Sequence, residues 1–154
     1  MSRFISVLEA STKLTLAGME KDKYGNYNRG YDIPFFGRTY KGRLSVDKIK
    51  NDTISDIQKK RYADFITNNA KYSKAAFKKL LAYIEVLGDY GEYFETHDKP
   101  KTEKEMGDLV KPYALVVNGD RNLILVCNAV WDDEHGVTIQ ILPNVDCGDL
   151  GNFF

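Results

Sequence analysis

The spacing of apolar residues changes twice along the chain and divides it into three zones. The first zone, residues 1 to about 48, alternates apolar with other residues, as half-buried β-strands do. The alternating pairs are Leu14 with Leu16, Ile33 with Phe35, and Leu44 with Val46. Segment 19–30, MEKDKYGNYNRG, is rich in Gly, Asn and charge, which predicts a surface loop. Pro34 cannot donate a ladder hydrogen bond, so its strand begins there or lies at a sheet edge.

The second zone, from about 52 to 110, has the spacing of amphipathic helices. The first helix places four apolar residues near one face: Ile54, Ile57, Phe65 and Ile66. Ser55 with Gln58, three residues on, has the form of a capping box at its start. The second helix carries a core stripe of Phe77, Leu80, Leu81, Ile84 and Leu87. We expect Ser73 to be the N-cap of this second helix.

A short third helix and a return to strands complete the pattern. Thr102 with Glu105 is a second capping box, and the helix it starts must stop before Pro112. Beyond residue 113, Asn118-Gly119 joins two nearly continuous apolar runs, which predicts a hairpin of central strands covered on both faces. The run 137–142, VTIQIL, alternates again as a half-buried strand.

This order of elements predicts one α+β domain over residues 1–154. Its antiparallel sheet is formed by the N-terminal strands and a C-terminal β-meander, with two to three helices packed on one face. Residues 1–29 have the weakest pattern, as a strand pair and a loop.

Composition narrows the function classes. Lys+Arg and Asp+Glu both number 22, so the chain lacks the basic excess of a nucleic-acid binder, and we expect no nucleic-acid partner. No stretch approaches the roughly 20 apolar residues that span a bilayer, and no secretory signal is recognisable. We therefore expect a cytoplasmic protein with no membrane partner. Cys127 and Cys147 lack metal or redox spacing and are expected to be free thiols, with Cys127 buried in an apolar run.

The run Trp131–Gly136, WDDEHG, is the strongest candidate for chemistry. It holds the only tryptophan, one of two histidines and three successive acids. His135 with Glu134 and Asp132 offers metal ligands or an acid–base pair, but adjacent residues rarely converge on one ion, and the alternating ligands of a calcium loop are missing. We expect no metal and no cofactor. The structural interpretation makes the run a turn between two strands, in which Gly136 supplies the backbone freedom.

Several stretches resemble a bacterial family of small cytosolic domains of unknown function. They are IPFFGRTYKGRLSV, DTISDIQKKRYADFITNN, VKPYALVV, LILVCNAVWDDEHGVTIQI and GDLGNFF. The resemblance covers roughly residues 30–154, and its most specific element is the Trp-Asp-x-Glu-His-Gly turn. It implies the order of elements described above and no particular activity. Look-alike families include immunity proteins of bacterial toxin systems, which is an analogy at the level of the fold.

The sequence therefore favours a protein-binding module, with an immunity-type inhibitor of a toxin as its specific form. The aromatic residues expected to contact a protein partner are Tyr83, Tyr90, Tyr93 and Trp131. The chain would be a monomer or a homodimer. Two alternatives stay open: a metal-dependent or acid–base enzyme centred on His135, Glu134 and Asp132, and a structural or dimerising protein.

Overall fold

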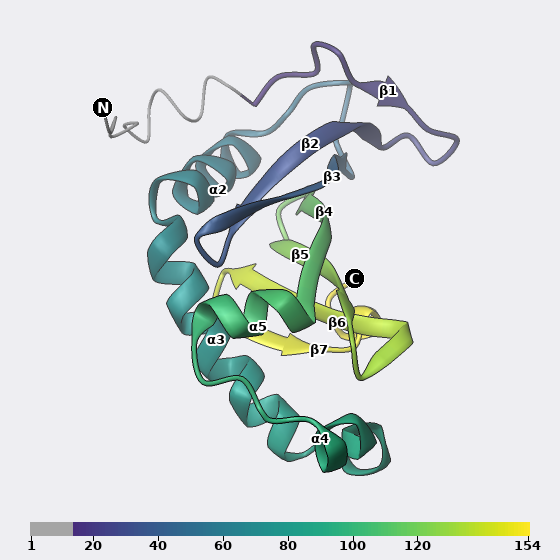
Figure 1. The fold of residues 1–154 in the computed structure, drawn as a ribbon. Coiled ribbons are helices and arrows are strands. Elements are labelled where there is room, and N and C mark those ends of the chain that lie inside the picture. Colours follow the sequence, from purple (N-terminus) through teal and green to yellow (C-terminus); the bar gives the residue numbers. More distant parts are fainter. Residues whose placement is uncertain (1–13) are drawn as a thin grey trace.

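The computed structural model describes residues 14–154, except for the side chains of residues 89 and 90 (Figure 1). The strands are β1 (Glu20–Lys21), β2 (Tyr27–Phe35), β3 (Arg38–Asp47), β4 (Val110–Asn118), β5 (Asn122–Ala129), β6 (Asp132–Leu142) and β7 (Asp146–Gly148). The α-helices are α2 (Asp56–Thr67), α3 (Asn69–Glu85), α4 (Tyr93–Thr96) and α5 (Glu103–Leu109), with 3-10 turns η1 (Gly88–Glu92) and η2 (Leu150–Asn152). The predicted α+β class is confirmed.

The described strands form one sheet of seven, in the order of the chain from β1 to β7. Neighbouring strands pair antiparallel, except that β3 and β4 are parallel, with Leu44 opposite Leu115 and Asp47 opposite Asn118. The parallel pair was not predicted. It arises because the helical zone carries the chain from the end of β3 back to the start of β4, a connection that no short turn can make.

The two faces of the sheet are covered by different parts of the chain. On one face, α2 and α3 run along the sheet (Figure 1). Their residues Phe65 and Leu80 join a core that includes Leu115 and Leu125 of the sheet. On the other face, a smaller cluster consists of Ala114, Val116, Ile124, Val126 and Phe153. The prediction that β4 and β5 are buried on both faces is confirmed, and the C-terminal tail supplies the second cover.

The N-terminal predictions were partly wrong. Residues 14–19 form no strand. The alternation there instead marks two leucines that pack on the core, with Leu14 buried and Leu16 partly buried. β2 begins at Tyr27, inside the segment predicted to be a loop, because β3 offers it a hydrogen-bonded partner along its whole length. β1 pairs only with the start of β2, so Pro34 lies on an unpaired edge of the described sheet, as expected.

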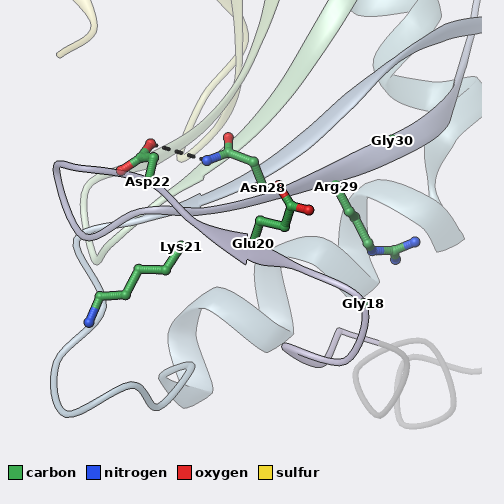
Figure 2. Close-up of a pocket in the computed structure, with 7 residues that line it drawn as sticks. All are labelled: Gly18, Glu20, Lys21, Asp22, Asn28, Arg29 and Gly30. Carbon is green, nitrogen blue, oxygen red and sulfur yellow. Dashed lines mark hydrogen bonds between the residues drawn. The ribbon is translucent and has the colours of Figure 1, made fainter.

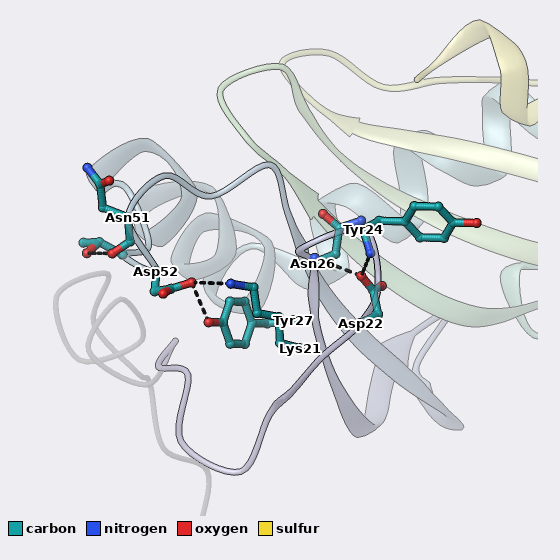
Figure 3. Close-up of polar contacts among 8 residues, drawn as sticks. Lys21, Asp22, Tyr24, Asn26, Tyr27, Asn51 and Asp52 are labelled. Atoms are coloured by element: carbon teal, nitrogen blue, oxygen red, sulfur yellow. Dashed lines mark hydrogen bonds and ion pairs between the residues drawn. The ribbon is translucent and has the colours of Figure 1, made fainter.

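One carboxylate fastens the β1–β2 hairpin to the loop that follows β3 (Figure 3). Asp52 accepts hydrogen bonds from the Tyr27 hydroxyl at 2.6 Å and from the Lys21 ammonium at 3.1 Å. The Tyr27 bond, followed by the interactions with Lys21, lowers the pKa of Asp52. In the hairpin turn, Asp22 accepts from the backbone N–H groups of Tyr24 and Asn26. Side-chain acceptors therefore replace backbone partners in this polar segment.

The helix starts were predicted with one error. Ser55 and Gln58 form the expected capping box of α2, and Thr102 accepts from the Glu105 N–H at the start of α5. Ser73 does not cap α3, which begins at Asn69. Instead Ser73 is buried within the helix, and its hydroxyl accepts from the Phe36 N–H after β2. No helix among the described residues has an apolar stretch long enough to cross a membrane.

Gln58 connects α2 to both strands of the parallel pair. Its side-chain oxygen accepts from the Ser55 N–H, while its side-chain nitrogen donates to the carbonyls of Asp47, at 3.0 Å, and Val117, at 3.3 Å. Gln58 is 1% exposed, so its hydrogen bonds are shielded from water. The Asp47 carbonyl also accepts from the Gly119 N–H at 2.9 Å.

Gln58→Glu tests this connection. The carboxylate keeps the acceptor of the capping box but places a second acceptor against two buried carbonyls. We expect a loss of about 2–4 kcal/mol in the free energy of unfolding at pH 7, measured by urea denaturation. Ser55→Ala, which removes only the cap, should cost about 1 kcal/mol. Equal losses in the two variants would show that the strand carbonyls do not depend on Gln58.

Candidate functional site

A large groove lies where α3 ends, beside the hairpin that joins β5 to β6. It has a volume of about 690 Å³. Four segments line it: Tyr83, Val86 and Leu87 at the C-terminal end of α3 and just beyond; Tyr113 of β4; Trp131, Asp132, Glu134 and His135 of the hairpin; and Asp149, Leu150 and Gly151 of the tail. We call it the acidic groove, because its lining contains three carboxylates and no Lys or Arg.

The WDDEHG run is a hairpin turn followed by a bulge. The turn itself is short, since Ala129 already pairs with Asp132. The next register pair is Cys127 with Val137, so β6 has three more residues than β5 between these two pairs. The bulge moves Glu134 and His135 outward, toward the groove. Gly136 ends the bulge with a backbone φ of +65°, which favours glycine. A Cβ at this position would also lie 2.1 Å from the Cys127 carbonyl oxygen.

Trp131 belongs to the core as well as to the groove. The residue is 8% exposed, and its ring centroid lies 6.5 Å from that of Tyr83 and 5.8 Å from that of Phe94. These contacts join the hairpin to α3 and α4. The ring therefore forms a fixed wall of the groove.

Asp132 stabilises the bulge through two bonds to one residue. Its Oδ1 accepts from the His135 backbone N–H at 3.0 Å and lies 3.2 Å from Nδ1 of the His135 ring. The His135 side chain is 60% exposed, so the ring faces solvent. Among residues 14–154, no group of three or more His, Cys, Asp or Glu side chains is arranged to hold a metal ion. The geometry makes Asp132 a partner of the turn and gives the metal-dependent alternative no ligand set in this region.

The other aromatic and cysteine residues considered from the sequence are not among the described residues that line the acidic groove. Tyr93 stacks on His97 at a centroid distance of 4.0 Å and does not line the groove. Tyr90 lies in η1, and its side chain is outside the described residues. Cys127 is 1% exposed, and burial raises the pKa of its thiol well above the usual value, so it is an inert core residue as expected.

Sequence reasoning missed the apolar members of the groove. Val86, Tyr113 and Leu150 are 78%, 40% and 42% exposed, and each comes from a different segment. Asp149 was also missed. Val86 directly follows α3 and Leu150 begins η2, but nothing in the local sequence indicates that the two residues line the same groove.

A chain of side-chain amides holds the tail in place. Asn122 of β5 donates to the Phe153 carbonyl at 2.7 Å and to the Gln140 side chain at 3.2 Å. Its oxygen accepts from the Asn118 side chain at 3.2 Å. Because Phe153 is also packed on the sheet, Asp149 and Leu150 are positioned at the rim of the groove.

A second depression lies between β1 and β2, and its charged side chains do not converge on one point (Figure 2). Its residues carry both charges, and Figure 2 shows Lys21 and Arg29 pointing to opposite sides of it. Asp22 is occupied by Asn28, which donates to it at 3.1 Å. The acidic groove, by contrast, gathers side chains from four segments of the chain.

Comparison with known proteins gives one match. A protein-family model described as "Domain of unknown function (DUF6985)" matches residues 15–145, a segment that contains strands β1–β6 and the whole Trp131–Gly136 run. No curated protein and no solved structure matches the chain.

Asp132→Ala tests the structural role of the bulge. Loss of the two bonds to His135 should reduce the free energy of unfolding by about 1–2 kcal/mol, or lower the melting temperature by roughly 2–8 °C, as followed by circular dichroism. Asp133→Ala is the matched control, because Asp133 is exposed and forms no ion pair among the described residues. It should change stability by less than about 0.5 kcal/mol. If the two variants have the same melting temperature, the stability of the bulge does not depend on Asp132.

Proposed function

The chain belongs to the DUF6985 family of domains of unknown function, and we propose that it is a protein-binding module whose partner docks in the acidic groove. The observation that carries this proposal is the composition of the groove. Exposed apolar side chains lie beside three carboxylates in an open depression of about 690 Å³. Such a surface is complementary to a protein segment with an apolar anchor flanked by Lys or Arg.

The apolar part supplies the binding energy, and the charges supply selectivity. Val86, at 78% exposed, is unusually open for an apolar residue beside a groove, and burying such a side chain contributes about 1.5–3 kcal/mol. Trp131 and Tyr83 form a stiff aromatic floor, which loses little conformational entropy on binding. Glu134 and Asp149 are exposed at the rim, where charges chiefly steer the approach of a basic partner.

The acid–base alternative is less well supported by the same residues. Asp132 orients His135, as a catalytic base would require. However, both residues lie within one bulge, and the bond to the His135 backbone gives Asp132 a structural role there. Neither cysteine is a nucleophile beside this pair, because Cys127 is buried and Cys147 donates to the Lys79 carbonyl.

The specific form of the proposal is an immunity-type inhibitor in the bacterial cytoplasm, which blocks a basic surface of a toxin. It is supported by the sequence resemblance described above and by the sign of the groove. Co-expression with the product of an adjacent gene tests this form. Growth rescue that is lost in a Glu134→Lys/Asp149→Lys variant would support it, and growth arrest with or without the protein would contradict it.

The general proposal is tested by the emission of Trp131, which is the only tryptophan of the chain. The protein is titrated with 12-residue peptides that place Leu or Phe between Lys and Arg residues. We expect saturable changes in emission with these peptides and none with acidic peptides of the same apolar centre.

Glu134→Gln/Asp149→Asn should weaken the binding of basic peptides about tenfold, a loss of roughly 1.4 kcal/mol. Glu20→Gln/Asp98→Asn is the matched control, because it removes two exposed carboxylates that do not line the groove. Equal binding by the two variants, or equal response to acidic and basic peptides, would contradict the proposal.

A further inference from the structure

A second groove lies beside the acidic groove and has the opposite charge. It has a volume of about 430 Å³, and its lining includes Arg38, Tyr40, Lys41, Lys111 and Tyr113. No carboxylate lines it, and we call it the basic groove. Tyr113 lines both grooves, so the two depressions share one aromatic wall.

The charges of both grooves are available to a partner. Among the described residues, the ion pairs involve neither Lys41 and Lys111 of the basic groove nor Glu134 and Asp149 of the acidic groove. Arg38 is already engaged, since it donates to Asp108 at 2.8 Å, and so contributes less.

Exposed apolar residues gather in the same region. Of the seven large hydrophobic side chains exposed among the described residues, Val86, Tyr113 and Leu150 line the acidic groove. A fourth, Val130, lies in the hairpin turn and lines a smaller depression that also contains Lys111 of the basic groove. An apolar surface bordered by unpaired charges of both signs is typical of a protein interface.

We propose that the partner of the acidic groove is a second copy of this chain, which presents its basic groove. The inference rests on the proposed function, because it names the occupant of the same groove. In a two-fold symmetric pair, a contact from one patch to another is repeated in reverse. An axis near Tyr113 therefore sets each acidic groove against the basic groove of the other copy, with Tyr113 at the centre.

The net charge of the chain does not oppose such a pair. Its formal net charge is zero, so two copies meet without net repulsion. The two complementary grooves also lie side by side, and the same docking event covers both of them along with the apolar side chains between them.

Two charge-reversal variants test the pairing in solution. The first, Glu134→Lys/Asp149→Lys, makes both grooves basic, and the second, Lys41→Glu/Lys111→Glu, makes both acidic. We expect the natural chain to dimerise with concentration in sedimentation equilibrium, more weakly as salt rises from 50 to about 500 mM. Each variant alone should dissociate at least about tenfold more readily, and an equimolar mixture should form heterodimers.

The control is Lys60→Glu/Lys101→Glu, which changes the net charge as the second variant does but alters residues outside both grooves. It should dimerise like the natural chain, and circular dichroism should show that all variants are folded. A natural chain that stays monomeric at several hundred micromolar, or variants that dimerise alone but gain nothing on mixing, would overturn the inference.

The outcome is separable from that of the proposed function. Lys41→Glu/Lys111→Glu keeps the acidic groove unchanged, so as a monomer it should still bind basic peptides through the Trp131 signal. Peptide binding without dimerisation would reject the second copy as the partner and leave the groove as a binding site. If neither peptide binding nor dimerisation is observed, both the groove as a binding site and the second copy as its partner are rejected.

Discussion

The structure depends on how one buried amide joins three elements. Gln58 caps α2 through its oxygen and holds the carbonyl ends of β3 and β4 through its nitrogen. These strands form the parallel pair of an otherwise antiparallel sheet, and parallel neighbours cannot be aligned by a hairpin turn. Gln58 donates to both strand ends and so ties them together, because hydrogen bonds shielded from water are costly to break.

The position of β4 then decides whether a groove exists. Tyr113 lies at a register shift of β4, between Pro112 and Ala114, and lines both the acidic and the basic groove. Its carbonyl also lies so close to β3 that only glycine fits at position 42, where an added Cβ would lie 2.4 Å from that oxygen. The central wall of the two grooves is therefore fixed by backbone packing against β3, far from Gln58 along the strand.

Trp131 belongs both to the core and to the groove that we propose binds a partner. Its ring is largely buried against Tyr83 and Phe94, and the exposed remainder forms a wall of the acidic groove. The bulge that follows places Glu134 and His135 at the rim, and Asp132 keeps the bulge closed. The run that looks most like chemistry in the sequence thus shapes one wall and part of the rim of the acidic groove.

The sequence by itself determined the fold class, the capping box of α2, the Thr102 cap of α5, and the central strands β4 and β5, because each depends on residues close together in the chain. It also singled out Tyr83, Trp131, Asp132, Glu134 and His135, all of which line the acidic groove. It could not find Val86, Tyr113, Asp149 or Leu150, nor the basic groove, because these residues are brought together by strand register and by the docking of the tail. Tertiary structure also decided where β2 starts, what Ser73 binds and which two strands are parallel. In each case the hydrogen-bond partners are remote in sequence, so their pairing exists only once the sheet has formed.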